Sequence, residues 1–189
     1  VALSEAEVHW REFLQELQQR GLHALKHIVS DDHTGLKAVF PSVAWQRCRF
    51  RLQQNAQAYV PSLDQRTPVA QSIGSIFNCA DLNSANVRLK QVVSHYQKTN
   101  AKLAQWIEGN IPEAFSVFAL AEKHQKRMRT SNALERINQE IKRRTRVAKI
   151  FPNEASLLRL VSTLLTETSE DWESGKIYLN MEPVDSHPV

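Results

Sequence analysis

The chain has 189 residues, of which 42% are hydrophobic, and this length and composition are typical of one globular domain, or of one domain with an insertion. Two cysteines exclude a disulfide framework and fit a reducing compartment, and no apolar run reaches the roughly 18 residues of a membrane-spanning helix. Five glycines argue against a turn-rich all-β fold, and neither a GxGxxG nor a GxxxxGK[ST] phosphate loop is present.

The net charge of +4 is unevenly distributed along the chain. Residues 123–149 hold ten basic and two acidic side chains, which sum to +8 and leave +4 − 8 = −4 for the other residues. Lys and Arg side chains gain affinity for phosphates by releasing counterions, so this segment is a candidate surface for binding a polyanion. A solvated basic helix face is an alternative that the charge alone leaves open.

The first third of the chain predicts a helix followed by two short extended segments. Ser4 to Glu7 forms a capping box and Gly21 suits a helix end, so residues 5–20 are expected to form an amphipathic helix. Its buried stripe is expected to consist of Trp10, Phe13, Leu14 and Leu17. The next expected elements are a strand over Leu25–Val29, a polar turn over 30–33, a short helix over 34–40, and a second strand or helix start over 43–52.

The remainder of the chain predicts helices. We expect shorter helices with turns over 63–86, a helical period from Leu89 to Gly109, and a short element from Pro112 to Leu120. A further helix carries Leu134, Ile137 and Ile141 and is charged on its other faces. Asn153 is expected to cap a last helix whose core-facing residues are Leu157, Leu160, Val161, Leu164 and Leu165. The tail after Leu179 is expected to be disordered.

Two acidic residues are candidates for chemistry, and each has a simpler interpretation. Asp31 ends the first predicted strand, where a carboxylate is fixed by the strand yet reachable from the loop, but Asp is also an ordinary turn residue. Glu135 lies at the edge of an apolar helix face, where it could equally pair with a nearby Lys or Arg. The cysteines and histidines lack the short, regular spacing of a zinc site, and no GxSxG nucleophile motif is present.

One long segment closely resembles the signature of the Mutator-family transposases. This segment is residues 129–147, RTSNALERINQEIKRRTRV, followed by Ile-Phe-Pro-Asn-Glu at 150–154. The resemblance extends in order over about residues 4–180. It includes Arg-Gly-Leu at 20–22, Val-Ser-Asp-Asp-His-Thr-Gly-Leu at 29–36, Trp-Gln-Arg-Cys at 45–48 and Leu-Leu-Arg-Leu-Val at 157–161.

The resemblance implies an α/β, helix-dominated fold: an incomplete ribonuclease-H-like core with a helical insertion. Asp31 matches the second Asp of the family's Asp-Asp-Glu triad and Glu135 matches its Glu, 135 − 31 = 104 residues later. In the family these carboxylates hold two divalent ions, Mg²⁺ or Mn²⁺. The implied segments are a partial core at 1–51, the insertion at 52–120, C-terminal core helices with the Glu and the basic run at 121–180, and a tail at 181–189.

The implied function is DNA cleavage and strand transfer in a bacterial, nucleoid-associated cytoplasmic protein that binds transposon ends and target DNA, with no membrane association. Homo-oligomers or pairing with an intact transposase are possible assemblies. The residues expected to contact DNA are Arg136, Lys142, Arg143, Arg144 and Arg146.

Two departures from the family pattern qualify this expectation. The family's first Asp lies upstream of the predicted helix over 5–20, so we expect this chain to be inactive by itself. The alternative is a non-catalytic remnant that binds DNA or a transposase. The second departure is at the family's Cys-x-x-His and Arg-Asn positions, which hold Cys48, Arg51, Gln54 and Asn55 here.

Overall fold

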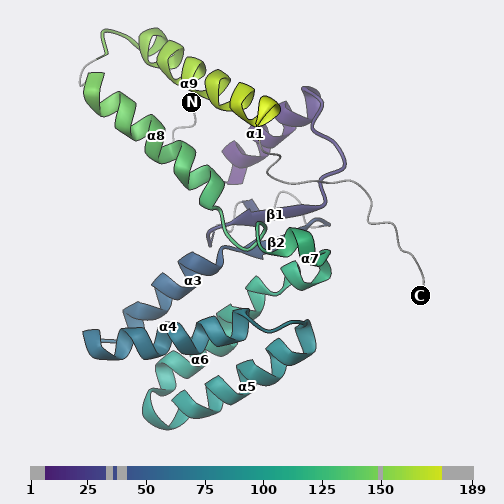
Figure 1. The fold of residues 1–189 in the computed structure, drawn as a ribbon, viewed down its shortest axis with the longest axis vertical. Helices are drawn as coiled ribbons and strands as arrows, with labels where there is room; N and C mark the ends of the chain where they lie inside the picture. The colour runs from purple at the N-terminus through teal and green to yellow at the C-terminus, as the bar shows by residue number, and fades with distance from the viewer. Residues whose placement is uncertain (1–6, 33–35, 38–41, 149–150, 176–189) are drawn as a thin grey trace. The chain divides into compact units, whose positions relative to one another are not determined.

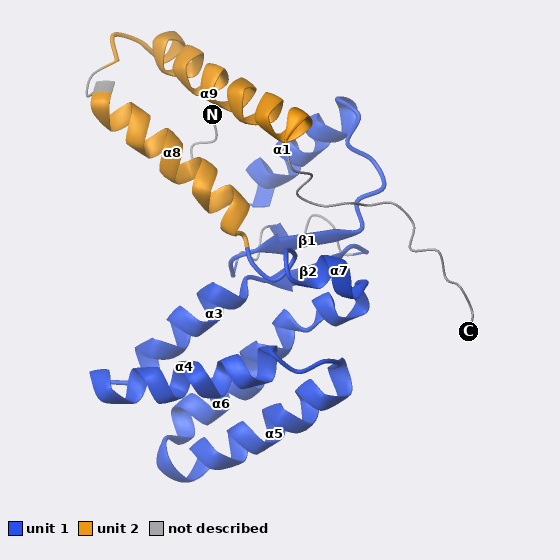
Figure 2. Ribbon diagram, in the orientation of Figure 1, with its two compact units in different colours: residues 1–130 blue, residues 131–189 orange. Residues whose placement is uncertain are grey.

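A computed structural model describes residues 7–32, 36–37, 42–148 and 151–175 of the chain. The chain divides into two compact units, residues 1–130 and residues 131–189 (Figure 2). The elements of the first unit (Figure 1) are α1 (Glu7–Gln19), β1 (His27–Ser30), β2 (Ala44–Arg47), α3 (Arg49–Ala56), η1 (Gln57–Tyr59), α4 (Leu63–Phe77), α5 (Leu82–Thr99), α6 (Ala101–Asn110), η2 (Ile111–Ala114), η3 (Ser116–Ala119) and α7 (Glu122–Gln125). The second unit contains α8 (Asn132–Ala148) and α9 (Glu154–Ser174).

Helix α1 ends where the sequence predicts. Gly21 adopts a φ of +106°, and the Leu22 amide donates to the Leu17 carbonyl at 2.9 Å, as in a glycine-terminated helix. Leu14 is buried, but Phe13 is 49% exposed, so the expectation that Phe13 belongs to a buried stripe is wrong. The Phe13 ring instead lies edge-on to Trp10 on the same helix. The capping box at residues 4–7 begins outside the described residues.

Strands β1 and β2 form a parallel pair in which Ile28 is opposite Trp45. The predicted strand over Leu25–Val29 is therefore confirmed, shifted by one or two residues. The segment 43–52 contains both of its predicted alternatives, since β2 passes directly into α3. The prediction of a helix-dominated α/β chain is confirmed by this small sheet among many helices. Of the short helix predicted over 34–40, the described residues Leu36 and Lys37 are helical.

Helices α3 to α6 enclose the main hydrophobic core. Its most completely buried large side chains include Leu52, Ile73, Ile76, Leu103 and Ile107. The single helical period expected from Leu89 to Gly109 is divided into α5 and α6 at Asn100. The Asn100 side chain caps α6 by accepting from the Leu103 amide at 3.1 Å, which a hydrophobic pattern does not reveal. Segment 63–86 holds one 15-residue helix, α4, and the start of α5 rather than several short helices.

Arg49, the first residue of α3, joins α3 to α4 and to the segment of η2 and η3. Its buried guanidinium donates to the Phe77 carbonyl at 2.7 Å and to the Ala114 carbonyl at 3.2 Å, and it lies over the rings of Phe77 and Phe118. Burial, with a smaller effect of nearby Arg129, lowers the pKa of Arg49 to about 10. The group is still cationic at neutral pH, so its carbonyl contacts stabilise the charge that burial would otherwise penalise.

The second unit is a pair of amphipathic helices. Asn153 caps α9 as predicted, accepting from the Ser156 amide at 2.9 Å. Leu164 is buried, but Leu165 is 43% exposed, so the expectation that Leu165 faces a core is wrong. On α8, Ile137 and Ile141 are half-buried and Leu134 is 59% exposed. The predicted disordered tail after Leu179 lies outside the described residues.

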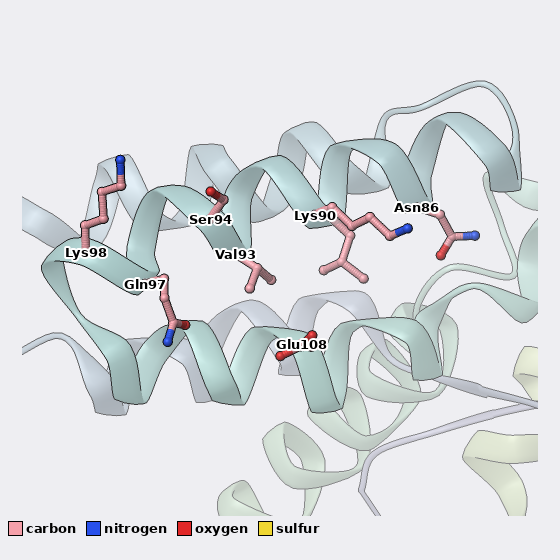
Figure 3. A pocket seen from close by; sticks show the side chains of 8 residues that line it. Asn86, Lys90, Val93, Ser94, Gln97, Lys98 and Glu108 are labelled. Atoms are coloured by element: carbon pink, nitrogen blue, oxygen red, sulfur yellow. The ribbon is translucent and has the colours of Figure 1, made fainter.

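A hollow of about 570 Å³ lies along α5 and α6, lined by Asn86, Leu89, Lys90, Val93, Ser94, Gln97, Lys98 and Glu108 (Figure 3). It contains none of the site residues that the sequence predicts. Within the described ranges, every helix is too short or too polar to cross a lipid bilayer.

Candidate functional site

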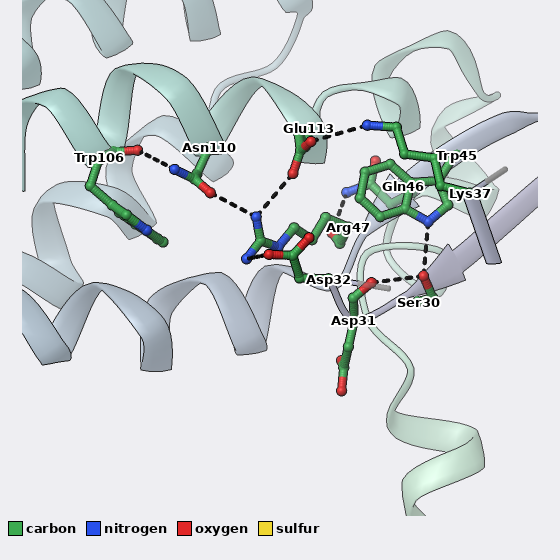
Figure 4. A network of polar contacts seen from close by, with 10 residues as sticks. All are labelled: Ser30, Asp31, Asp32, Lys37, Trp45, Gln46, Arg47, Trp106, Asn110 and Glu113. Atoms are coloured by element: carbon green, nitrogen blue, oxygen red, sulfur yellow. Dashed lines mark hydrogen bonds and ion pairs between the residues drawn. The ribbon is translucent and has the colours of Figure 1, made fainter. Parts of the chain in front are cut away.

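The candidate site begins at the carboxyl end of β1, where Asp31 and Asp32 follow the strand. Ser30 fixes the start of this turn: its hydroxyl accepts from Trp45 Nε1 at 2.8 Å and donates to the Asp31 carbonyl at 2.8 Å (Figure 4). The Cys48 amide donates to the Ser30 carbonyl at 2.7 Å. Contacts with β2 and the start of α3 therefore hold the acidic turn.

Asp32 is held by a buried arginine. Arg47 is 3% exposed and places Nη2 2.9 Å from Asp32 Oδ2. Its Nη1 is 2.9 Å from Glu113 Oε2 and donates to Asn110 Oδ1 at 2.8 Å, and these partners lie on η2 and at the end of α6 (Figure 4). When the Asn55 side-chain amide is oriented so that both its oxygen and its nitrogen have hydrogen-bond partners, the oxygen accepts from Arg47 Nη2 at 3.2 Å. One guanidinium thus joins the acidic turn to the end of α6 and to η2.

The carboxylate of Glu113 also contacts a second basic side chain, that of Lys37. Lys37 Nζ is 3.1 Å from Glu113 Oε1 and 4.5 Å from the centre of the Trp45 ring. Two cations therefore share the Glu113 carboxylate, and Trp45 contacts both the turn and one of those cations (Figure 4). This network stabilises the turn from the side of β2 and η2.

Asp31 has a different environment from its neighbour. Its Oδ2 is 3.3 Å from Arg51 Nε, and the two side chains are 54% and 41% exposed. Arg51 Nη1 also donates to Gln54 Oε1 at 3.2 Å, within α3. The carboxylate that the family resemblance singles out therefore pairs with a partly exposed arginine, whereas Asp32, which is 58% exposed, is tied to the buried Arg47.

Glu135 lies in the second unit, at the start of α8. It is half-buried, its amide donates to the Ser131 carbonyl at 3.0 Å, and Ser131 Oγ contacts Glu135 Oε1 at 3.4 Å. Because Asp31 and Glu135 belong to different compact units, their association in one site stays a prediction. The predicted segment boundaries at 51, 120 and 180 also stay predictions.

The carboxylates do not fit a divalent metal ion by themselves. No group of three or more His, Cys, Asp or Glu side chains within the described ranges is arranged to hold one. Asp31 and Asp32 have suitable oxygen ligands, but each already contacts an arginine. The predicted magnesium ligands Asp31 and Glu135 therefore require additional groups to complete a site.

The predicted DNA-contacting residues of α8 form two groups. Glu140 binds Arg143 through two contacts, at 2.6 and 2.8 Å, and Arg144 Nε at 2.9 Å. Hydrogen bonds from Arg143 and then Arg144 lower the pKa of Glu140 to about 2. Arg136, Lys142 and Arg146 are not among the partners of Glu140, and all five basic side chains lie on the same helix. Contact with DNA stays a prediction for each.

Sequence reasoning missed the residues that build the turn. Arg47 lies in the Trp-Gln-Arg-Cys run, but Asn110 and Glu113 belong to no motif that the sequence analysis used, and 63 and 66 residues separate Arg47 from these two partners. The available signal was the polar pair Gln46–Arg47 inside a short strand, because a buried polar side chain needs a specific partner. Gln46 is also buried, and its Oε1 accepts from Ser116 Oγ and from the Val117 amide.

The sequence as a whole identifies the class of protein. The profile of the family described as "Transposase, Mutator family" matches residues 1–175, so the chain belongs to the Mutator family of transposases.

Several curated relatives are similar over nearly the whole chain. The chain is 51% identical over 187 residues to the transposase for insertion sequence element IS406 of Burkholderia multivorans, covering 97% of this chain and 48% of the relative. It is 36% identical to the ISRM5 transposase of Rhizobium meliloti, covering 97% and 47%. It is 29% identical to the IS256 transposase of transposon Tn4001 from Staphylococcus aureus, covering 94% and 47%. The chain thus spans about half the length of the relatives it matches.

Proposed function

We propose that this chain is part of a transposase that cuts DNA at the ends of an insertion sequence and joins the freed ends to target DNA. The family membership over residues 1–175 carries this proposal. In hydrolysis, water attacks a phosphodiester and releases a 3′ hydroxyl. In strand transfer, that hydroxyl attacks a target phosphodiester and displaces another 3′ hydroxyl, so the number of phosphodiester bonds is conserved and no oxidant is needed.

Asp31 is the proposed catalytic carboxylate of the first unit. Its position directly after a parallel strand supports this role, because reactive groups of α/β folds collect at the carboxyl ends of strands. Glu135 is its proposed counterpart in the second unit, and the two would belong to a ribonuclease-H-like Asp-Asp-Glu site. Binding of two Mg²⁺ or Mn²⁺ ions is part of the same proposal, with Asp31 and Glu135 supplying one carboxylate each beside further ligands.

The basic helix α8 is the proposed DNA-contacting element. Arg136, Lys142 and Arg146 are the side chains best placed for phosphate contacts, which fix position without reading sequence. Arg143 and Arg144 would have to leave Glu140 to take part. Binding to transposon ends and to target DNA, a nucleoid association and an oligomeric assembly follow from this proposal.

A second candidate function is DNA or transposase binding without catalysis. The ion pair between Asp31 and Arg51 favours it, because that carboxylate already has a positively charged neighbour in this chain. Under this alternative, residues 1–189 bind DNA through α8 but turn over no substrate.

The test uses a complete transposase in which residues 1–189 replace the matching segment of the Burkholderia multivorans relative. The substrate is a labelled duplex carrying the ends of that relative's insertion sequence, with Mg²⁺ or Mn²⁺. We expect nicking that Asp31→Asn and Glu135→Gln each abolish and that Glu140→Gln, the control on the same helix, retains. Nicking that survives Asp31→Asn would refute the catalytic role. DNA binding without nicking in the unsubstituted protein would favour the non-catalytic alternative.

A further inference from the structure

Helix α5 of the first unit carries positive charge that its own sequence does not compensate. Its 18 residues include three basic side chains, those of Arg88, Lys90 and Lys98, and no Asp or Glu. On an ordinary solvated helix face, basic side chains alternate with acidic ones three or four residues away. Because α5 lacks such pairs, its basic side chains are open to an anionic partner from outside the helix.

The two lysines differ from the arginine in their contacts. Arg88 Nε donates to Ser75 Oγ on α4 at 2.9 Å, and its Nη1 donates to Gln91 Oε1 at 3.1 Å. Lys90 and Lys98 are exposed, and neither ammonium group has a hydrogen bond or an ion pair among the residues that the structure describes. They are eight residues apart, which places their Cα atoms roughly 12 Å apart along the helix axis.

Neutral hydrogen-bonding groups lie beside these lysines. Ser94 and Gln97 are exposed, line the same hollow of about 570 Å³, and likewise have no side-chain partner within the described ranges. Figure 3 shows Lys90, Ser94 and Lys98 in succession along α5, and Glu108 on α6 is the one carboxylate of the lining. Two lysines and one glutamate give this lining a net charge of +1. We call four of its side chains the α5 donor face: Lys90, Ser94, Gln97 and Lys98.

We propose that the α5 donor face binds the sugar-phosphate backbone of duplex DNA, as a second DNA surface in addition to α8. This inference rests on the proposed function, which makes DNA the substrate. Lysine, serine and glutamine side chains are among the groups that contact phosphate and sugar oxygens, and such contacts position a protein without reading sequence. Lys90 and Lys98 need break no internal ion pair to bind a phosphate, whereas Arg143 and Arg144 on α8 must first leave Glu140.

The experiment measures binding of a fluorescein-labelled duplex of random sequence to residues 1–189, by anisotropy over a series of salt concentrations. Each lost phosphate contact should reduce the slope of log K against log salt by roughly 0.9. We expect that reduction from Lys90→Gln and from Lys98→Gln, and a reduction of roughly 1.8 when both are combined. Both side chains are exposed and unpaired among the described residues, so the urea midpoint of each variant should not change.

A matched control separates this face from the net charge of the chain. Arg88→Gln removes the same charge from the same helix, two positions from Lys90, but its guanidinium is held by Ser75 and Gln91. Since residues two apart on a helix do not face the same way, this variant should leave the slope unchanged. An unchanged slope in the combined Lys90 and Lys98 variant, or an equal fall with Arg88→Gln, would overturn the proposal.

An acidic protein segment is the other polyanion that could bind a basic helix face. Amide signals of residues 90–98 in the ¹⁵N-labelled chain are followed while duplex DNA or polyglutamate is added at equal charge concentration. We expect DNA to shift these signals more strongly than polyglutamate does. Equal or larger shifts with polyglutamate would assign the face to an acidic protein segment and overturn the proposal.

This outcome is separable from that of the proposed function. Nicking by the complete transposase, together with an unchanged salt slope in the combined Lys90 and Lys98 variant, would remove this inference alone. A reduced slope in that variant, together with no nicking by the complete transposase, would remove the proposed cleavage and leave the second DNA surface established.

Discussion

Arg47 and Arg51 each contact one aspartate of the same turn, and their replacement by Met should have very different effects on stability. Arg47 is 3% exposed, and removing one partner of a fully buried ion pair costs about 3–5 kcal/mol. Its carboxylate partners, Asp32 and Glu113, are 58% and 29% exposed and can regain water, so we expect the lower end, about 3 kcal/mol. Arg51→Met breaks an exposed pair and should cost about 0–1 kcal/mol.

Urea unfolding, followed by tryptophan fluorescence, measures both values. Three of the four tryptophans, Trp10, Trp45 and Trp106, lie in the first unit and Trp172 lies in the second, so most of the emission reports the first unit. Both substitutions remove one positive charge and change the side-chain volume by the same amount. A loss of about 3 kcal/mol corresponds to a fall in Tm of roughly 6–12 °C for a chain of this size. Equal losses in the two variants, or a loss below about 1 kcal/mol for Arg47→Met, would show that the buried guanidinium is not what holds the turn.

The remaining predictions concern the second unit. The Glu140 carboxyl should titrate near pH 2 by carbon NMR. The pKa of Glu140 in the folded chain is lowered from the ordinary value of 4.5 to about 2, so its contribution to stability is present above pH 4.5 and is lost as the pH falls through about 2. A titration midpoint near pH 4.5 would contradict the ion pairs of Glu140 with Arg143 and Arg144. Glu140→Gln should strengthen binding to random duplex DNA, because it releases Arg143 and Arg144. Lys142→Ala should reduce the slope of log K against log salt by roughly 0.9. An unchanged slope in the Lys142 variant would show that α8 does not contact DNA. Asn153→Ala should cost about 1 kcal/mol in the unfolding of α9, whereas Asn138→Ala on α8 should not, as measured by urea unfolding followed by circular dichroism.

Local signals in the sequence predicted the ends of elements well. Gly21 ends α1 and Asn153 caps α9, because both act through the backbone of their own neighbours. Asn100 breaks the expected long helix by the same mechanism, but the apolar period runs through it on both sides and conceals the break. Patterns of apolar residues predicted burial less well, since Phe13 and Leu165 keep helical spacing yet are exposed.

The candidate site could be predicted only in part. Asp31 is found from the sequence because it sits in a recognisable run, and the structure places it directly after a strand, as expected; the parallel pairing of that strand was not predicted. The distinction between Asp31 and Asp32 could not be predicted, because it depends on Arg47 and on Glu113, 66 residues further along the chain. Contacts over such separations leave no periodic trace in a single sequence.

Asp31 is the proposed functional carboxylate of the turn, and Asp32 the proposed structural one. The most direct test is to compare Asp31→Asn with Asp32→Asn in the complete transposase, measuring nicking of the labelled ends and the urea midpoint on the same samples. We predict that Asp31→Asn abolishes nicking with an unchanged midpoint, and that Asp32→Asn lowers the midpoint because it breaks the contact with Arg47. A stable Asp32→Asn protein without nicking, beside an active Asp31→Asn protein, would contradict this assignment.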